Sequence, residues 1–177
     1  SENVGNNLKK NTNKKVLSLF HPINNHLPKK ISKDEALSNL NLPSMKYILF
    51  IGLVRKYKGV ETLIEAFIHL AKIYRDIYLT CIGYERGSSF DKCKDYLDKE
   101  NLIDKVSFKG FVAYERLPDF YGKSDIVVVP SEIYESFSYT VAQGMACGKP
   151  VVASDIGGIP ETVNKGEAGV LFDTGNV

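Results

Sequence analysis

Short apolar runs alternate with amphipathic stretches through most of the chain. The runs predict strands buried on both faces at 47–54, 77–83, 106–108, 126–129 and 151–153, with a short sixth strand at 169–172. The stretches between them predict helices at 59–74, 90–101, 115–122, 139–147 and 159–164. Strands that alternate with helices indicate an α/β fold with a doubly wound, Rossmann-like parallel sheet. Ligands of such sheets bind beyond the carboxyl ends of the strands.

The amino-terminal part lacks this alternation. Residues 1–15 are rich in Asn and Lys and cannot bury apolar surface, which predicts a flexible arm. Residues 16–46 are predicted to be a linker region with a short strand at 16–20 and a helix that ends at Leu40. The sequence Ser-Lys-Asp-Glu at 32–35 is typical of a capping box at the start of that helix.

Composition places the chain among soluble globular domains. Of its 177 residues, 44% are hydrophobic and 25% are charged, and the net charge of +2 is too small to indicate nucleic acid or a membrane surface as a partner. Cys81, Cys93 and Cys147 have no metal-ligand spacing and are predicted to be free thiols of a reducing compartment. No membrane-spanning run or secretory pattern occurs, so cytoplasm is the expected location, while membrane association of a longer protein stays open.

Residues 131–161 carry the most informative chemistry. They read as the end of a buried strand, a loop with Glu135, a helix, a Gly-Lys-Pro turn and a second buried strand. A helix N-terminus offers free N–H groups and a positive dipole end to a phosphate. A carboxylate offers two acceptor oxygens to sugar hydroxyls. The pattern therefore favours a site for a sugar held beside a phosphate.

The same segment resembles the donor-binding signature of retaining glycosyltransferases of the GT-B fold, especially glycosyltransferase family 4, also called group 1. That signature is Glu, seven residues and a second Glu, followed by Ala-Met-Ala-Cys-Gly-Lys/Thr-Pro-Val-Val and Gly-Gly-x-Pro-Glu. Residues 144–152 read Gly-Met-Ala-Cys-Gly-Lys-Pro-Val-Val, and residues 157–161 read Gly-Gly-Ile-Pro-Glu. The resemblance extends over 47–172. It departs at the second Glu, where the chain has Gln143.

The resemblance implies what the chain does. Residues 47–177 would be the nucleotide-sugar-binding half of a GT-B enzyme, without the N-terminal acceptor-binding domain and without the last C-terminal helices. A complete enzyme would move a sugar from a nucleotide diphosphate sugar to a glycan, lipid or other acceptor, with retention at the anomeric carbon. The donor is a substrate and no cofactor is implied. The fragment alone is expected to be inactive.

The loop after the first long strand contains the predicted diphosphate clamp. Gly52 ends the strand, and Arg55 and Lys58 follow it at the start of a helix. An Arg fork and a Lys point charge both suit a diphosphate. In the family an Arg directly follows the Gly, whereas Leu53 does so here, so the resemblance passes the catalytic Arg role to Arg55 and gives the Lys role to Lys58. A solvated basic turn is the alternative for this segment considered alone.

Two further loops are assigned by resemblance. Gly83 ends the second strand, where the family has a turn that lets the backbone pass close to the donor; a glycine that merely ends a strand is an equal alternative. Phe111 and Val112 correspond to the loop that surrounds the nucleobase in the family, although Phe111 fits a core position equally well.

Glu135 is the leading site residue, because its counterparts contact the transferred sugar near the anomeric carbon. Capping the next helix is a compatible alternative role for it. Gln143 would contact the ribose with roughly half the strength of a charged partner, and the alternative is that the nucleotide is held differently. The residues between them correspond to positions that approach the distal phosphate and sugar: Ser136, Phe137, Ser138, Tyr139 and Thr140.

Three motifs are absent from the sequence, and their absence counts against several classes of enzyme. The chain has no Asp-x-Asp, so a metal-bound diphosphate and a metal site are not predicted. It also has no phosphate-binding Gly-x-x-x-x-Gly-Lys-Ser/Thr and no Gly-x-Gly-x-x-Gly, which counts against a nucleotide hydrolase or a dehydrogenase. Two alternatives to a transferase remain open, namely a GT-B-like epimerase or phosphorylase and a non-catalytic nucleotide-sugar-binding module.

Overall fold

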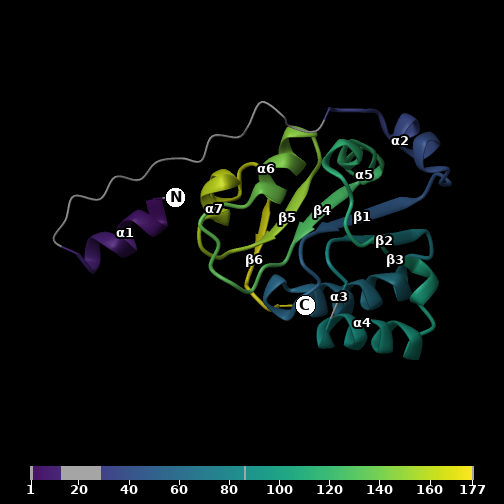
Figure 1. Ribbon diagram of the computed structural model, residues 1–177, viewed down its shortest axis with the longest axis horizontal. Helices are drawn as coiled ribbons and strands as arrows, with labels where there is room; N and C mark the ends of the chain where they lie inside the picture. The colour runs from purple at the N-terminus through teal and green to yellow at the C-terminus, as the bar shows by residue number, and fades with distance from the viewer. Residues whose placement is uncertain (1, 13–28, 86, 177) are drawn as a thin grey trace.

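A six-stranded parallel sheet forms the centre of the computed structural model, which describes residues 2–12, 29–85 and 87–176 (Figure 1). The strands are β1 (Lys46–Ile51), β2 (Ile77–Ile82), β3 (Val106–Phe108), β4 (Ile126–Val129), β5 (Val151–Ser154) and β6 (Val170–Phe172). Their spatial order is β3-β2-β1-β4-β5-β6. The order reverses between β1 and β4, and this switch point is where doubly wound sheets form a ligand crevice. The predicted fold class is confirmed.

Helices cover both faces of the sheet. The helices of the described residues are α1 (Glu2–Lys10), which lies apart from the sheet, α2 (Lys33–Leu40), α3 (Val60–Ile73), α4 (Ser88–Lys99), α5 (Leu117–Lys123), α6 (Tyr139–Ala146) and α7 (Ile159–Thr162). Short 3-10 turns are η1 (Lys56–Lys58), η2 (Ile103–Lys105), η3 (Tyr114–Arg116) and η4 (Asn164–Gly166). The helices α3 and α4 lie together on one face, and α5 and α6 lie on the other with α2 beside α5 (Figure 1). None of the described helices is both long and apolar enough to cross a lipid bilayer.

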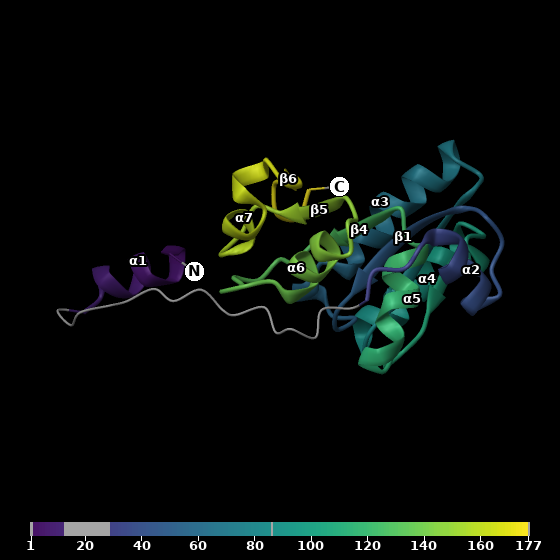
Figure 2. The ribbon, with the colours of Figure 1, turned by 90° about the horizontal axis from the view of Figure 1, so that it is seen from above.

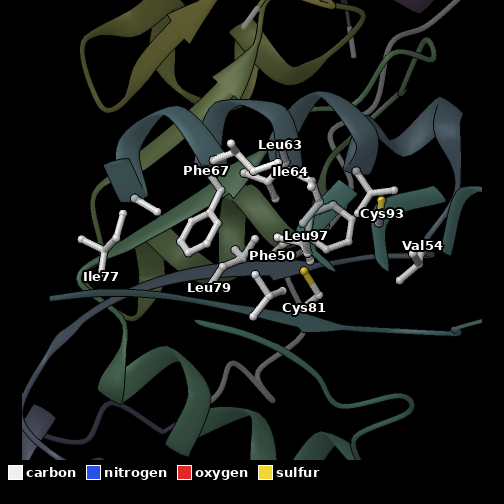
Figure 3. Packing of buried hydrophobic residues seen from close by; sticks show 14 residues of the cluster. Phe50, Val54, Leu63, Ile64, Phe67, Ile77, Leu79, Cys81, Cys93 and Leu97 are labelled. Carbon is white, nitrogen blue, oxygen red and sulfur yellow. The ribbon is translucent and has the colours of Figure 1, made fainter. Parts of the chain in front are cut away.

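The period of two along each strand divides the core into two clusters. In β1, Phe50 packs with the residues of α3 and α4, whereas Leu49 packs with those of α5 and α6. In Figure 3 the side chains of Leu63 and Phe67 point from α3 towards the strands, because residues four apart share one face of a helix. The three cysteines are buried free thiols, as predicted.

The prediction that the first five strands are buried on both faces is wrong for β4 and β5. Their inward residues are buried under α5, α6 and α7, but the opposite side is only half-buried at Ile126, Val128 and Val152. These side chains line an apolar hollow of about 340 Å³ beside α3. Because α3 and α4 lie over β1, β2 and β3, this half of the face has no covering helix among the described residues.

The segments before β1 agree with their sequence-based predictions to different extents. The helix α2 begins as predicted, since the Ser32 hydroxyl accepts a hydrogen bond from the Glu35 N–H at 3.1 Å. The strand expected at 16–20 lies outside the described residues. In the predicted flexible arm, residues 2–10 form α1, which extends away from the sheet layers (Figure 1 and Figure 2). The Glu2 N–H donates to Glu161 Oε2 of α7 at 2.7 Å.

Lys123, the last residue of α5, is an unusual component of this interior because its side chain is almost fully buried. Its Nζ donates to Thr80 Oγ1 at 2.7 Å and lies 4.7 Å from the centre of the Tyr47 ring. Burial, and to a smaller extent the charge of Lys109, lowers the pKa of Lys123 to about 8. The ammonium form therefore destabilises the folded state at neutral pH.

We expect this lysine to give a measurable pH dependence when the chain is compared with Lys123→Met. Below pH 8 the folded and unfolded states both carry the charge. Between pH 8 and about 10.4, the unfolded pKa of lysine, only the unfolded state keeps the proton, so the stability of the natural chain rises relative to the variant. The relative gain should be about 1–3 kcal/mol in denaturant unfolding at pH 7 and pH 10. A constant difference between the two proteins would show that Lys123 titrates normally.

Candidate functional site

A cavity of about 210 Å³ opens at the carboxyl ends of β1 and β4, at the switch point of the sheet. Its lining comes from the end of β1, from the turn before α3, from the loop after β4 and from the first turn of α6. The lining residues are Phe50, Ile51, Gly52, Lys58, Val129, Pro130, Ser131, Glu135, Phe137, Ser138, Tyr139 and Thr140. Seven of these were predicted from the sequence, namely Gly52, Lys58, Glu135, Phe137, Ser138, Tyr139 and Thr140.

A glycine places Lys58 in this cavity. The chain leaves β1 at Gly52 and passes through η1 before α3 begins. Gly59, between η1 and α3, has φ of 70°, and a Cβ there would lie 1.6 Å from the Pro130 carbonyl oxygen. No other residue fits this approach without a shift of the backbone. The turn is therefore held against the loop after β4, with Lys58 directed at that loop.

Glu135 is fixed from two sides. The buried Ser131 hydroxyl donates to Glu135 Oε1. Behind the loop, the Gly158 N–H donates to the Glu135 carbonyl oxygen at 2.6 Å. Gly157 has φ of 61°, and a Cβ there would lie 2.4 Å from the same oxygen. The Gly-Gly pair thus supports the backbone of Glu135 from the β5–α7 turn.

Lys58 and Glu135 form an ion pair inside the cavity. The distance from Lys58 Nζ to Glu135 Oε1 is 2.5 Å, and the side chains are 29% and 13% exposed. Partial burial strengthens such a pair relative to one at the surface. Each charge therefore keeps the other in place, and a ligand with both an anionic group and hydroxyls can replace the two halves of the pair simultaneously.

The N-terminus of α6 forms the opposite wall. Ser138 is its N-cap, and its hydroxyl accepts a hydrogen bond from the Val141 N–H at 3.5 Å. The capping role considered for Glu135 therefore belongs to Ser138. Thr140 Oγ1 donates to the Ile51 carbonyl oxygen at 3.2 Å and ties α6 to the end of β1. The positive end of the helix dipole consequently faces the cavity near Lys58.

Two of the predicted residues at the ends of β1 and β2 do not line the cavity. Arg55 is exposed, and its guanidinium lies next to Gly87, where a Cβ would be 2.3 Å from Nη1. Gly83 packs on Gly52 instead, because a Cβ there would lie 1.8 Å from the Gly52 carbonyl oxygen. The glycine at this strand end therefore permits contact between neighbouring turns of the protein itself.

Four other predicted residues also lie outside the lining. Ser136 and Phe111 are exposed, Phe111 at 80%, which excludes the core position considered for it. Val112 packs against the core on the α5 side. Gln143, one turn into α6, accepts a hydrogen bond from the Tyr121 hydroxyl at 3.0 Å, which fixes its amide.

Sequence reasoning missed Ser131 and the role of Gly157. Ser131 directly follows Pro130 at the end of a strand, a position that in parallel sheets reaches the ligand edge. Gly157 was noted only as part of a motif, since nothing local indicates that it contacts a loop twenty residues earlier. Among the described residues no group of three or more His, Cys, Asp or Glu side chains is arranged to hold a metal ion.

Comparison with known proteins identifies the family. The family model described as "Glycosyl transferases group 1" matches residues 32–177. The chain belongs to this family. Its parallel sheet and flanking helices accordingly match those of GT-B glycosyltransferases.

Individual relatives agree with this assignment. The chain is 32% identical over 133 residues to D-inositol 3-phosphate glycosyltransferase of Paenarthrobacter aurescens, covering 74% of this chain and 32% of that protein. Among solved structures, Alr3699/HepE of Anabaena in complex with UDP and glucose has a TM-score of 0.74 and 25% identity, covering 86% of this chain and 41% of the other. The C-terminal domain of LpcC, a group 1 family protein of Francisella tularensis, has a TM-score of 0.73 and 27% identity, covering 85% of this chain and 78% of the other.

The chain spans about a third of the length of the curated relatives it matches, with 32% to 38% of each covered. By contrast it covers most of the LpcC C-terminal domain, which was solved as a domain by itself. The group 1 match therefore concerns the part of these proteins that corresponds to one sheet and its helices.

The approach of Gly59 to Pro130 should be essential for stability. We expect Gly59→Ala to lower the free energy of unfolding by at least about 2 kcal/mol more than Gly166→Ala. Gly166 is a matched control, because it also has positive φ but a Cβ there meets no atom within 4 Å. Denaturant unfolding of both variants measures the difference, and equal losses would mean that backbone strain alone is responsible.

The Lys58–Glu135 pair should show energetic coupling. A double-mutant cycle with Lys58→Met and Glu135→Gln is expected to give about 1 kcal/mol of interaction in unfolding experiments. The exposed pair Lys72–Glu100, at 2.8 Å with side chains 55% and 41% exposed, is the control and should give about 0.3 kcal/mol. Additive effects of the two substitutions would contradict a formed pair in solution.

Proposed function

We propose that this chain is the donor-binding domain of a retaining, family-4-like glycosyltransferase. The donor is a nucleotide diphosphate sugar, and a UDP-sugar is the first class to test, because Alr3699/HepE was solved with UDP and glucose. The acceptor is a glycan, a lipid or another hydroxyl compound, and the acceptor-binding domain lies in a part of the protein outside this chain.

The observation that supports this proposal is the Lys58–Glu135 pair beside the first turn of α6. The cavity joins one cation, one carboxylate and a helix N-terminus within about 210 Å³. A diphosphate matches the cation and the helix dipole. The hydroxyls of a sugar match the carboxylate once Lys58 turns from it to the phosphate.

The proposed roles follow from these positions. Lys58 and the N-terminus of α6 bind the diphosphate and stabilise the charge that grows on it as the sugar leaves. Glu135, oriented by Ser131, holds hydroxyls of the transferred sugar. Arg55 joins the diphosphate only if its side chain leaves Gly87.

The nucleoside half of the donor would lie towards the loop after β3. Gly52 and Gly83 permit a close backbone approach there, and Phe111 and Val112 follow on the next loop. Gln143 would meet the ribose through its free amide N–H group, because its Oε1 already accepts from Tyr121.

Transfer with retention on this site needs no nucleophile from the domain. The departing phosphate takes the proton of the acceptor hydroxyl on the face from which it leaves, and the acceptor oxygen forms the new bond to the anomeric carbon. This chain supplies electrostatic stabilisation, and the partner domain supplies the acceptor. The chain alone should therefore bind donor without transferring sugar.

A calorimetric titration tests the donor site. We expect saturable binding of one nucleoside diphosphate among UDP, GDP and ADP, weakened about tenfold or more by Lys58→Ala because a charge-assisted phosphate contact is lost. Glu135→Ala should weaken binding of the sugar conjugate but not of the free nucleotide. Lys99→Met, which alters an exposed lysine on α4, serves as the control.

Binding of no nucleotide, or binding that ignores Lys58, would contradict the proposed site. The reaction itself is then examined with a protein that includes the partner domain, by analysis of its products with and without acceptor. Donor binding without any transfer would favour a non-catalytic binding module. An altered sugar nucleotide, or a free sugar phosphate, would instead indicate an epimerase or a phosphorylase.

A further inference from the structure

A second cavity lies on the sheet face opposite α3 and α4, and it shares no lining residue with the donor cavity. It measures about 260 Å³ and lies between the turn after α2, the end of α5 and the strands β1, β2 and β3. The lining residues are Leu40, Leu42, Pro43, Tyr47, Tyr78, Leu79, Thr80, Asp104, Lys105, Ser107, Lys109, Phe120 and Lys123.

Lys123 supplies the cavity with a buried cation that lacks a counter-ion. The residue is 2% exposed, and its Nζ donates to the Thr80 hydroxyl and lies over the rings of Tyr47 and Phe120 at 4.7 and 5.5 Å. Within the described part of the chain no carboxylate lies within 4 Å of this nitrogen. An ammonium has three N–H donors, and buried charges in proteins are ordinarily paired.

Two more lysines extend the positive charge along the sheet edge. Ser107 of β3 lines the cavity, and so do Lys105 at the end of η2 and Lys109 just after the strand. Lys105 lies over the Tyr78 ring at 5.3 Å and donates to the Arg75 carbonyl oxygen. Lys109 is exposed, and its charge contributes to the lowered pKa of Lys123.

The charge balance of the lining is strongly positive. Three lysines oppose one carboxylate, that of Asp104, which is exposed. The hydroxyls of Thr80 and Ser107 add donors beside the cations. Three cations and two hydroxyls suit a head group with several acceptor oxygens, and lysine binds phosphate in this way as a point charge.

The rest of the wall is apolar and partly aromatic. The centroids of the Tyr47 and Tyr78 rings lie 5.9 Å apart with the rings tilted by 36°, and both residues line the cavity. Leu42 and Pro43 close the cavity from the turn after α2, and Leu42 remains 37% exposed. A free inorganic anion would leave this apolar surface uncovered, whereas a ligand with a small apolar body would bury it.

We propose that this cavity binds a small phosphate monoester, with its phosphate paired to Lys123 and Lys109 and its apolar body against Tyr47 and Tyr78. The site is separate from the donor site and does not depend on the function proposed above. Binding supplies the counter-ion that the interior lacks, so it also stabilises the folded chain.

Phenyl phosphate is the probe, with inorganic phosphate and phenol as its two halves. We expect saturable binding of phenyl phosphate to the 177-residue chain in calorimetry, at least tenfold tighter than either half. Lys123→Met, which keeps the apolar stem and removes the charge, should weaken this binding at least tenfold, whereas Lys99→Met on α4 should not change it.

Two further readouts separate a binding role of Lys123 from a structural one. The exposed Lys109→Glu variant reverses a charge at the cavity mouth without disturbing the core, and it should weaken binding at least fivefold. At pH 8.5, binding to the natural chain should take up protons, because the phosphate favours the charged form of Lys123. Titration in buffers of different ionisation enthalpy measures this uptake, which Lys123→Met should abolish.

Three results would overturn the proposal. The first is no saturable binding of phenyl phosphate. The second is binding that Lys123→Met and Lys109→Glu leave intact. The third is binding that UDP displaces or that Lys58→Met abolishes, since this would place the phosphate in the donor cavity. Failure of UDP to bind at all would leave the second site unaffected, so the two proposals are tested separately.

Discussion

The candidate site depends on the close approach of backbones at the carboxyl edge of the sheet. Gly59 brings the turn before α3 against Pro130, and Gly157 brings the turn after β5 against Glu135. A side chain at either position would separate loops that come from distant parts of the sequence. Because these backbones meet, Lys58 and Glu135 lie within 2.5 Å of each other without long flexible linkers. The ion pair is thus a consequence of backbone packing at the topological switch point of the sheet.

Half-buried Lys58 and buried Lys123 have contrasting electrostatic surroundings. Lys58 lies in a cavity that contains a carboxylate, so its charge is matched before any ligand arrives. Lys123 is more deeply buried, and a hydroxyl and two aromatic rings are its described partners. Burial penalises the charged form of such a group, which is why the pKa of Lys123 is lowered. In the first arrangement a ligand anion can take the place of Glu135 as the partner of Lys58. In the second, Lys123 has no carboxylate partner among the described residues, so a bound anion would supply its counter-ion.

The two faces of the sheet are covered to different extents. On the face of α5, α6 and α7 the inward residues of β4 and β5 are buried, which holds the loops after these strands in place. On the other face, α3 and α4 lie mainly over β1, β2 and β3, and Val128 of β4 packs at the edge of their cluster. The apolar side chains Val128 and Val152 remain half-buried there, although every residue of β4 and the first three of β5 are apolar. Apolar content therefore overstated burial, because burial also requires a neighbouring element.

The sequence by itself determined the alternation of strands and helices, the start of α2 at Ser32 and the segment around Glu135, because periodicity, capping and short motifs are local properties. It also indicated Lys58 as a partner of that segment. Only the tertiary structure decided that Arg55 points to Gly87 and that Ser131 orients Glu135. The Arg55 contact joins two loops that are far apart in the chain, whereas Ser131 and Glu135 lie in one loop whose backbone is held by Gly157 and Gly158 from the turn after β5. No local pattern encodes the direction in which a side chain leaves a loop.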